Sequence, residues 1–139
     1  MNGDTVLIDT GPLIALLIGA DAHHAWAAGQ FEPLRPPLLT CEPVLTEACH
    51  IIGRHGGDPE TVLELVQSKV LELTFTVDDH LPDLLALMRR YRDVPMSLAD
   101  ACLVRMSERH RHCRIMTTDT DFRLYRRHAR QVIPLLAPW

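Results

Sequence analysis

Two carboxylates in this sequence follow directly after short apolar segments that are predicted to be β-strands, and a third lies two positions further along. Asp9 follows residues 5–8 (TVLI), and Asp119 follows residues 114–118 (RIMTT), with Asp121 two positions later. In an open α/β sheet, ligands bind at the carboxyl ends of the strands. These positions therefore predict that the acids meet at one edge of a sheet, where their oxygens could hold a cation.

Two further acids lie on predicted helices. In the helix predicted from Pro43, Glu47 lies beside the apolar stripe. In the helix predicted from Ser97, Asp100 lies on the side away from the charged residues. A carboxylate on an apolar face is costly unless something compensates its charge, so both positions favour a functional role.

Each acid also has a purely structural interpretation. Asp9 could form an Asx turn before a helix, and Asp100 could complete a capping box at the start of its helix. Asp119 or Asp121 could cap the next helix, and Glu47 could extend from a half-buried position to water. Each acid alone is weak evidence for a site, and their predicted convergence on one edge of the sheet is the stronger evidence.

Carboxylates that lie close together repel one another, and their pKa values would rise unless a cation lay among them. A ligand set of oxygens without His or Cys suits Mg²⁺ or Mn²⁺. Water bound to such an ion can act as the nucleophile in phosphodiester hydrolysis, and a pair of ions can contact both the attacking and the leaving oxygen. The residue pattern allows either one ion or two.

Strands alternate with helices along the chain. We predict strands at residues 5–8, 37–40, 70–75, 114–118 and 131–136. We predict helices at residues 12–18, 22–30, 43–53, 58–68, 78–91, 97–110 and 120–128. Short apolar strands separated by helices are typical of an α/β fold with a parallel β-sheet flanked by α-helices. The length predicts a single domain over residues 1–139.

The triplet Asp9-Thr10-Gly11 allows a second interpretation, because retroviral-type aspartic proteases carry Asp-Thr-Gly in their catalytic dyad. Those proteases consist almost entirely of strands, and no apolar helix follows their catalytic glycine. Here Pro12 suits the first turn of a helix, and helices are predicted along the whole chain. The alternating pattern therefore argues against a protease.

The charge is unevenly distributed around the overall net charge of −4. Residues 1–88 hold 3 basic and 13 acidic residues, which gives −10, and residues 89–139 hold 11 Arg and 5 acids, which gives +6. Arginine suits phosphate recognition because its planar side chain can bind two oxygens at once. The basic half could therefore form a nucleic-acid face or a solvated, Arg-rich surface.

The remaining features predict a cytoplasmic protein that does not contact membranes. No apolar stretch is long enough for a transmembrane helix, and the first residues lack the basic region of a signal peptide. The four cysteines lack C-x-x-C spacing and lie in or beside apolar segments. That placement is typical of reduced, packed thiols.

The segments VLIDTGPLIALL, CEPVLTEA, SLADACLV and TTDTDF, in this order and spacing, resemble the PIN-domain family. More closely, they resemble the VapC-like toxins of bacterial type II toxin–antitoxin systems, and the resemblance covers essentially the whole chain. It implies a Mg²⁺- or Mn²⁺-dependent endoribonuclease with a PIN-like fold. It also implies inhibition by a cognate antitoxin protein and the formation of a homodimer.

The resemblance implies roles for individual residues. The catalytic acids would be Asp9, Glu47, Asp100 and Asp119. The metal ligands would be Asp9 and Asp100 principally, with Asp119 and Asp121. Hydroxyl groups that could orient ligands or water belong to Thr10, Ser97 and Thr118. The RNA backbone would contact Arg123, Arg126 and Arg127. The alternative is a non-catalytic PIN-like module that binds RNA or a protein partner, and the complete acidic set argues against it.

Overall fold

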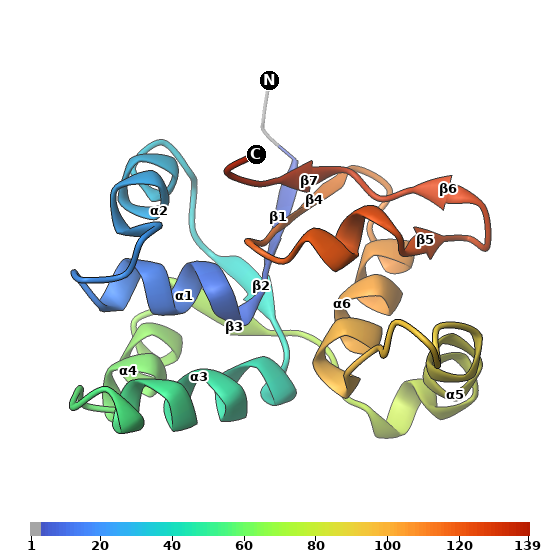
Figure 1. The fold of residues 1–139 in the computed structure, drawn as a ribbon, viewed down its shortest axis with the longest axis horizontal. Helices are drawn as coiled ribbons and strands as arrows, with labels where there is room; N and C mark the ends of the chain where they lie inside the picture. The colour runs from blue at the N-terminus through green and yellow to red at the C-terminus, as the bar shows by residue number, and fades with distance from the viewer. Residues whose placement is uncertain (1–3) are drawn as a thin grey trace.

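The computed structural model describes residues 4–139, in which a five-stranded sheet has the order β3-β2-β1-β4-β7 (Figure 1). The strands are β1 (Thr5–Ile8), β2 (Leu38–Thr40), β3 (Leu71–Leu73), β4 (Cys113–Met116) and β7 (Leu135–Leu136). Every neighbouring pair in this sheet is parallel. The carboxyl ends of β1 and β4 therefore lie side by side at the same edge of the sheet.

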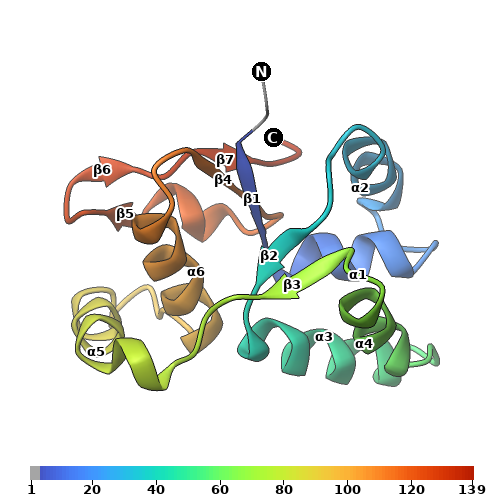
Figure 2. The same cartoon turned by 180° about the vertical axis from the view of Figure 1, so that it is seen from behind.

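Within residues 4–139, six α-helices connect and flank the strands. They are α1 (Thr10–Leu17), α2 (His24–Phe31), α3 (Glu42–Arg54), α4 (Glu60–Gln67), α5 (Leu81–Arg90) and α6 (Leu98–Arg109). In Figure 1, α1, α2 and α4 lie to one side of β1, and α5 and α6 lie to the other. Figure 2 shows the edge strand β3 from behind. The predicted α/β fold, a parallel sheet flanked by helices, is confirmed.

The core holds the central strands and α6 in place. Leu7 and Ile8 of β1, Ile115 of β4, and Leu103 and Val104 of α6 are all fully buried. Burying an apolar side chain of this size contributes about 1.5–3 kcal/mol to the free energy of unfolding. The core therefore fixes the ends of β1, β4 and α6, from which the candidate acids extend.

The region after β4 differs from the prediction. The helix predicted over residues 120–128 is wrong, because only a 3₁₀ turn, η2 (Thr120–Arg123), forms there. It is followed by β5 (Arg126–Arg127), which pairs antiparallel with β6 (Gln131–Val132). His128 and Ala129 adopt left-handed backbone angles, with φ of 50° and 68°, and these angles form the turn between β5 and β6.

The segment predicted as one strand over residues 131–136 forms two strands, β6 and β7, so its extended character is confirmed and its continuity is not. Pro134 lies between them and has no amide hydrogen to donate to a neighbouring strand. The first part therefore pairs with β5 and the second with β4. Similarly, the helix predicted over 78–91 begins as a 3₁₀ turn, η1 (Asp78–His80), ahead of α5.

Two further observations concern the cysteines and the length of the helices. All four cysteines have free thiols, and Cys41, Cys102 and Cys113 are buried. Among residues 4–139, no helix is both long and apolar enough to cross a membrane.

Candidate functional site

A cavity of about 290 Å³ opens where β1 and β4 end. Four of the five predicted acids line it, namely Asp9, Glu47, Asp100 and Asp119. They come from the ends of two strands and from two helices, as the sequence predicts. Asp121 does not line this cavity.

Asp9 is the most deeply buried acid of the cavity, with 6% of its surface exposed. Its side chain caps α1 by accepting a hydrogen bond of 2.8 Å from the amide of Thr10. The pKa of Asp9 is raised to about 7, mainly by burial and to a smaller extent by the charges of Asp100 and Asp119, while hydrogen bonds from Thr117 and Thr10 partly oppose this rise. Asp9 therefore both caps a helix and bears a charge that the protein alone compensates poorly.

Asp100 also combines two roles that the sequence presents as alternatives. It forms a capping box at the start of α6, in which the Ser97 hydroxyl accepts from the Asp100 amide and Asp100 accepts from the Ser97 amide. The same carboxylate lines the cavity and accepts a hydrogen bond of 3.0 Å from the Tyr125 hydroxyl. Burial is the main cause of the raised pKa of Asp100. Capping therefore fixes the carboxylate in place without removing it from the cavity.

Tyr125 is a site residue that the sequence motifs do not indicate. Its side chain is fully buried and packs edge-to-face against Phe122 and Tyr91, with ring centroids 5.2 and 5.1 Å apart. Burial raises the pKa of its hydroxyl, and the neighbouring Asp100 raises it further. The hydroxyl therefore stays protonated and serves as a fixed donor to Asp100.

The remaining acids differ in their exposure. Glu47 extends from α3 and is exposed at the rim of the cavity. Asp119 is half-buried and caps η2 by accepting from the amide of Asp121 at 2.9 Å. The predicted capping role of Asp119 is thus confirmed, and its side chain lines the cavity as well.

A buried threonine, Thr117, joins two of the acids. Its hydroxyl donates a hydrogen bond of 2.8 Å to Asp9 and accepts one of 2.9 Å from the amide of Asp119. Thr118, whose hydroxyl was predicted to orient ligands or water, lines the cavity as well, and that role stays a prediction. Strand β4 ends at Met116, but the Thr117 amide still donates to the carbonyl of Leu136, the last residue of β7. Thr117 is thereby held as a continuation of the strand, with its side chain buried.

Thr118 has a different neighbour, which explains the glycine in Asp-Thr-Gly. A Cβ atom at Gly11 would overlap the hydroxyl of Thr118. Glycine therefore allows the segment after β4 to approach the start of α1 closely. Thr10, predicted to orient ligands, also lines the cavity, and its hydroxyl is buried without a hydrogen-bond partner in the described chain.

We expect Thr117→Val to lower the activity of the site more than Thr118→Val does. Valine keeps the shape of threonine but removes the donor to Asp9, and loss of a group that orients a ligand typically costs about 10- to 100-fold. Metal affinity and RNA cleavage, measured for both variants, check this prediction. Equal losses in the two variants would contradict the assignment of Thr117.

The arginines predicted to contact RNA differ in their availability. Arg127 is only 5% exposed, and its guanidinium donates to the carbonyls of Ser107, His110 and Arg111 at the end of α6. The guanidinium of Arg127 is therefore committed to capping α6, and its predicted contact with the RNA backbone stays a prediction.

The other two arginines precede Arg127 in the chain. The guanidinium of Arg126 also donates hydrogen bonds within the protein. One of its terminal nitrogens lies within hydrogen-bond distance of the carbonyls of Arg123, Leu124 and Tyr125. Arg123 is exposed on η2, which Asp119 caps. Of the three, Arg123 is the side chain that remains free to meet a ligand near the acids.

Two residues from the connection between α1 and α2 complete the cavity. Asp21 and His23 line it, and Asp21 accepts a hydrogen bond of 2.8 Å from the His23 amide. The sequence pattern does not identify either residue as part of the site, because it predicts a helix from residue 22, whereas α2 begins at His24. His23 is the one lining residue whose side chain can carry a positive charge.

The chemical character of the cavity fits a divalent cation. All of its acidic groups offer oxygen ligands, Asp9 is an acid with a raised pKa, and the Thr10 hydroxyl lacks a partner in the described chain. As arranged here, the acids share a cavity without converging on one point. Residues 4–139 contain no group of three or more His, Cys, Asp or Glu side chains positioned to hold a metal ion. The cavity therefore offers the kinds of ligand atoms that a divalent cation prefers, although its acids are not arranged around a single point.

Comparison with known proteins agrees with this fold. No curated protein matches the sequence significantly. Among solved structures, the chain is similar to Mycobacterium tuberculosis VapC20, a sarcin-ricin loop cleaving toxin, with 20% sequence identity and a TM-score of 0.69. The match covers 76% of this chain and 82% of that one. A family model described as the PIN domain matches residues 6–127. This match spans well over half of the sequence, and the chain therefore belongs to the PIN domain family.

Proposed function

We propose that this protein is an endoribonuclease that hydrolyses RNA phosphodiester bonds with the help of Mg²⁺ or Mn²⁺. The observation that carries the proposal is the buried Asp9, whose pKa is raised to about 7 in a cavity that it shares with Asp100, Asp119 and Glu47. A protein gains little from such crowded acids unless a cation compensates them. Membership of the PIN domain family supports the same chemistry.

The cation would be held by Asp9, Asp100 and Asp119, with Asp121 as a further candidate. When bound, it would polarise the phosphoryl group and lower the pKa of an attacking water. Thr117 fixes the carboxylate of Asp9, and Tyr125 fixes that of Asp100. In-line hydrolysis would leave a 3′-hydroxyl and a 5′-phosphate.

Substrate contacts near the acids would come from exposed side chains. Arg123 is exposed beside Asp119 and suits a phosphate of the RNA backbone. His23 lines the cavity and is exposed, so it suits the same role. The similarity to VapC20, a toxin that cleaves the sarcin-ricin loop, makes a structured RNA loop a substrate worth testing.

In the cell, we propose that the protein is the toxin of a toxin–antitoxin pair in the cytoplasm. A cognate antitoxin would bind it and block the acidic cavity, and the toxin itself would form a homodimer. The fold shared with a known toxin supports these proposals. Co-expression with the product of a small neighbouring gene tests them, since a cognate antitoxin should restore growth that the nuclease alone arrests.

The alternative is a PIN-like module that binds RNA or a protein partner without cleaving RNA. The observation that favours it is that the acids among residues 4–139 do not converge into a ready metal site. Under this alternative, RNA would bind with or without metal and would remain intact.

Purified protein, freed of any antitoxin, is expected to cleave single-stranded or looped RNA in Mg²⁺ or Mn²⁺ and to stop when EDTA is in excess. The physical reason is that the acids alone cannot activate water between their own negative charges. Gel analysis of RNA cleavage in both conditions checks this. Undiminished cleavage in EDTA would overturn metal dependence, and binding without cleavage in either metal would favour the module.

A further inference from the structure

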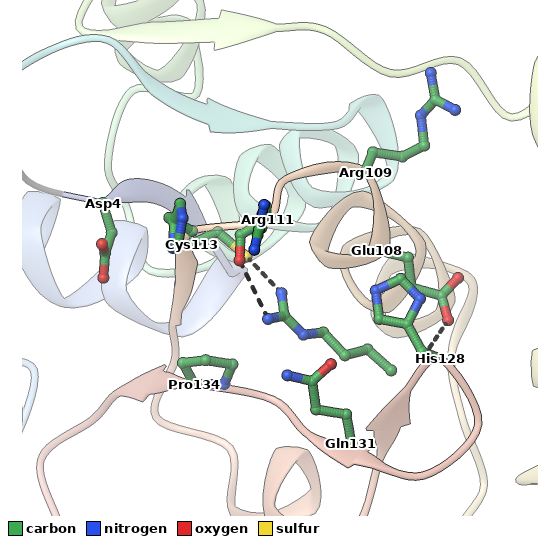
Figure 3. A pocket seen from close by; sticks show the side chains of 10 residues that line it. Asp4, Glu108, Arg109, Arg111, Cys113, His128, Gln131 and Pro134 are labelled. Carbon is green, nitrogen blue, oxygen red and sulfur yellow. Dashed lines mark hydrogen bonds between the residues drawn. The ribbon is translucent and has the colours of Figure 1, made fainter.

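A second cavity, of about 600 Å³, lies at the opposite end of α6 from the acidic one (Figure 3). Its walls come from the end of α6, the start of β4 and the hairpin of β5 and β6. Asp100 is in the first turn of α6 and Arg109 is its last residue, so about 13 Å of helix separates them. None of the predicted catalytic acids lines this second cavity.

The two acids that line the second cavity each lie beside an arginine that does not line it. Glu108 accepts from Arg105 at 3.1 Å and from the amide of His128 at 2.8 Å. Asp4 lies 3.8 Å from the guanidinium of Arg114. Neither Arg105 nor Arg114 lines the cavity. Each lining acid therefore has one positively charged partner outside the cavity, although Arg105 shares its charge between Glu108 and Asp83.

The positive charge in the lining is not balanced. Arg109, Arg111 and Arg127 line the cavity, and none of them forms an ion pair with a carboxylate within the described residues. Arg109 and Arg111 are exposed, so water solvates their charges. Arg127 is buried, and a buried charge is normally paired with one of opposite sign.

The hydrogen bonds of Arg127 leave part of its guanidinium unused. One terminal nitrogen donates to the carbonyls of Ser107 and His110 and to the sulfur of Cys113, while the other donates to the carbonyl of Arg111. The Nε atom has no hydrogen-bond partner among the described residues. The guanidinium therefore contacts the sulfur of Cys113 and the carbonyl of Arg111, and both of these residues line the cavity.

We propose that this second cavity binds a phosphate group, held by Arg109 and Arg111 from the rim and by the charge of the buried Arg127 behind them. A phosphate offers the negative charge and the multiple acceptor oxygens that guanidinium groups bind best. The last carbonyls of α6, which would repel an anion, are already covered by Arg127. The volume of the cavity also accommodates a mononucleotide or one linkage of an RNA strand.

The test uses the full chain with Asp9→Asn, in EDTA, so that RNA survives and the acidic site plays no part. Inorganic phosphate is titrated at low ionic strength while backbone amide and arginine Nε–H signals are followed by NMR. We expect saturable shifts at Cys113, Gln131 and the Arg127 Nε–H. The double variant Arg109→Gln and Arg111→Gln should weaken binding by at least about tenfold, since charge-assisted hydrogen bonds are lost.

The matched control replaces two exposed arginines elsewhere, Arg54→Gln and Arg92→Gln, and removes the same charge. Its affinity for phosphate should stay within about twofold of that of the Asp9→Asn protein, because salt screens the long-range contribution of these two charges. Shifts that never saturate, or an equal effect of the double variant and the control, would overturn the proposal.

Titration with AMP and with a short RNA strand separates the sources of the phosphate. If a free nucleotide is the ligand, AMP and inorganic phosphate shift the same signals, and the double variant weakens both. If the backbone of RNA is the ligand, the strand saturates the same signals at a much lower concentration than inorganic phosphate or AMP does, and the double variant lowers the salt dependence of its binding. If none of the three probes shifts these signals, the cavity does not bind phosphate.

Discussion

Asp9→Asn is expected to abolish RNA cleavage, with a loss of about a thousandfold or more. The substitution removes a charge that would hold the cation, whereas loss of a group that merely orients a ligand costs about 10- to 100-fold. Asparagine keeps the shape of the side chain and can still accept from the Thr10 amide. Single-turnover cleavage of an RNA substrate in saturating Mg²⁺ measures the effect.

The matched control is Asp93→Asn, which removes one carboxylate from the exposed segment between α5 and α6. It should retain the activity of the parent within about twofold, because an exposed acid away from the cavity acts only through a screened charge. Near-parental cleavage by the Asp9→Asn protein would remove Asp9 from the catalytic set and, with it, the proposed mechanism.

The second large effect concerns stability without metal. The pKa of Asp9 rises from 3.8 to about 7 on folding, so the folded state binds this proton more tightly than the unfolded chain does. The stabilisation from protonated Asp9 is therefore fully present below about pH 4 and is lost as the pH rises to about 7. A rise of this size corresponds to about 4 kcal/mol.

Comparison with Asp9→Asn isolates this contribution, because asparagine does not titrate. In EDTA, we expect the free energy of unfolding of the parent to fall relative to that of Asp9→Asn between pH 4 and pH 8, by up to about 4 kcal/mol. Denaturant melts of both proteins across this range measure the difference. A constant difference between the two proteins would mean that Asp9 is charged in the folded protein throughout, at odds with its burial.

Added Mg²⁺ should then reverse the loss in the parent alone. At pH 8, a concentration one hundred times the dissociation constant would stabilise the parent by about 2.7 kcal/mol, because the ion binds the folded state. Asp9→Asn should respond far less, while Asp93→Asn should respond like the parent. An equal response of all three proteins would place the binding of Mg²⁺ elsewhere.

The sequence alone determined much of the fold and of the acid set. The strand ending before Asp9 and the strand near Asp119 are local apolar patterns, and the alternation of strands and helices requires a parallel sheet. Because parallel strands align their carboxyl ends at one edge, these two acids had to lie near each other. Glu47 and Asp100 followed from helical periodicity, and both line the same cavity.

Only the tertiary structure decided which side chains support those acids. The hydrogen bond between Asp9 and Thr117 joins residues 108 positions apart, and that between Asp100 and Tyr125 joins residues 25 apart. Local patterns carry no information about such distances, so the choice between Thr117 and Thr118 depends on how far β4 continues. The burial of Arg127 was hidden for the same reason. Its partners are carbonyls at the end of another helix, and a carbonyl is present in every residue, so no side-chain pattern identifies it.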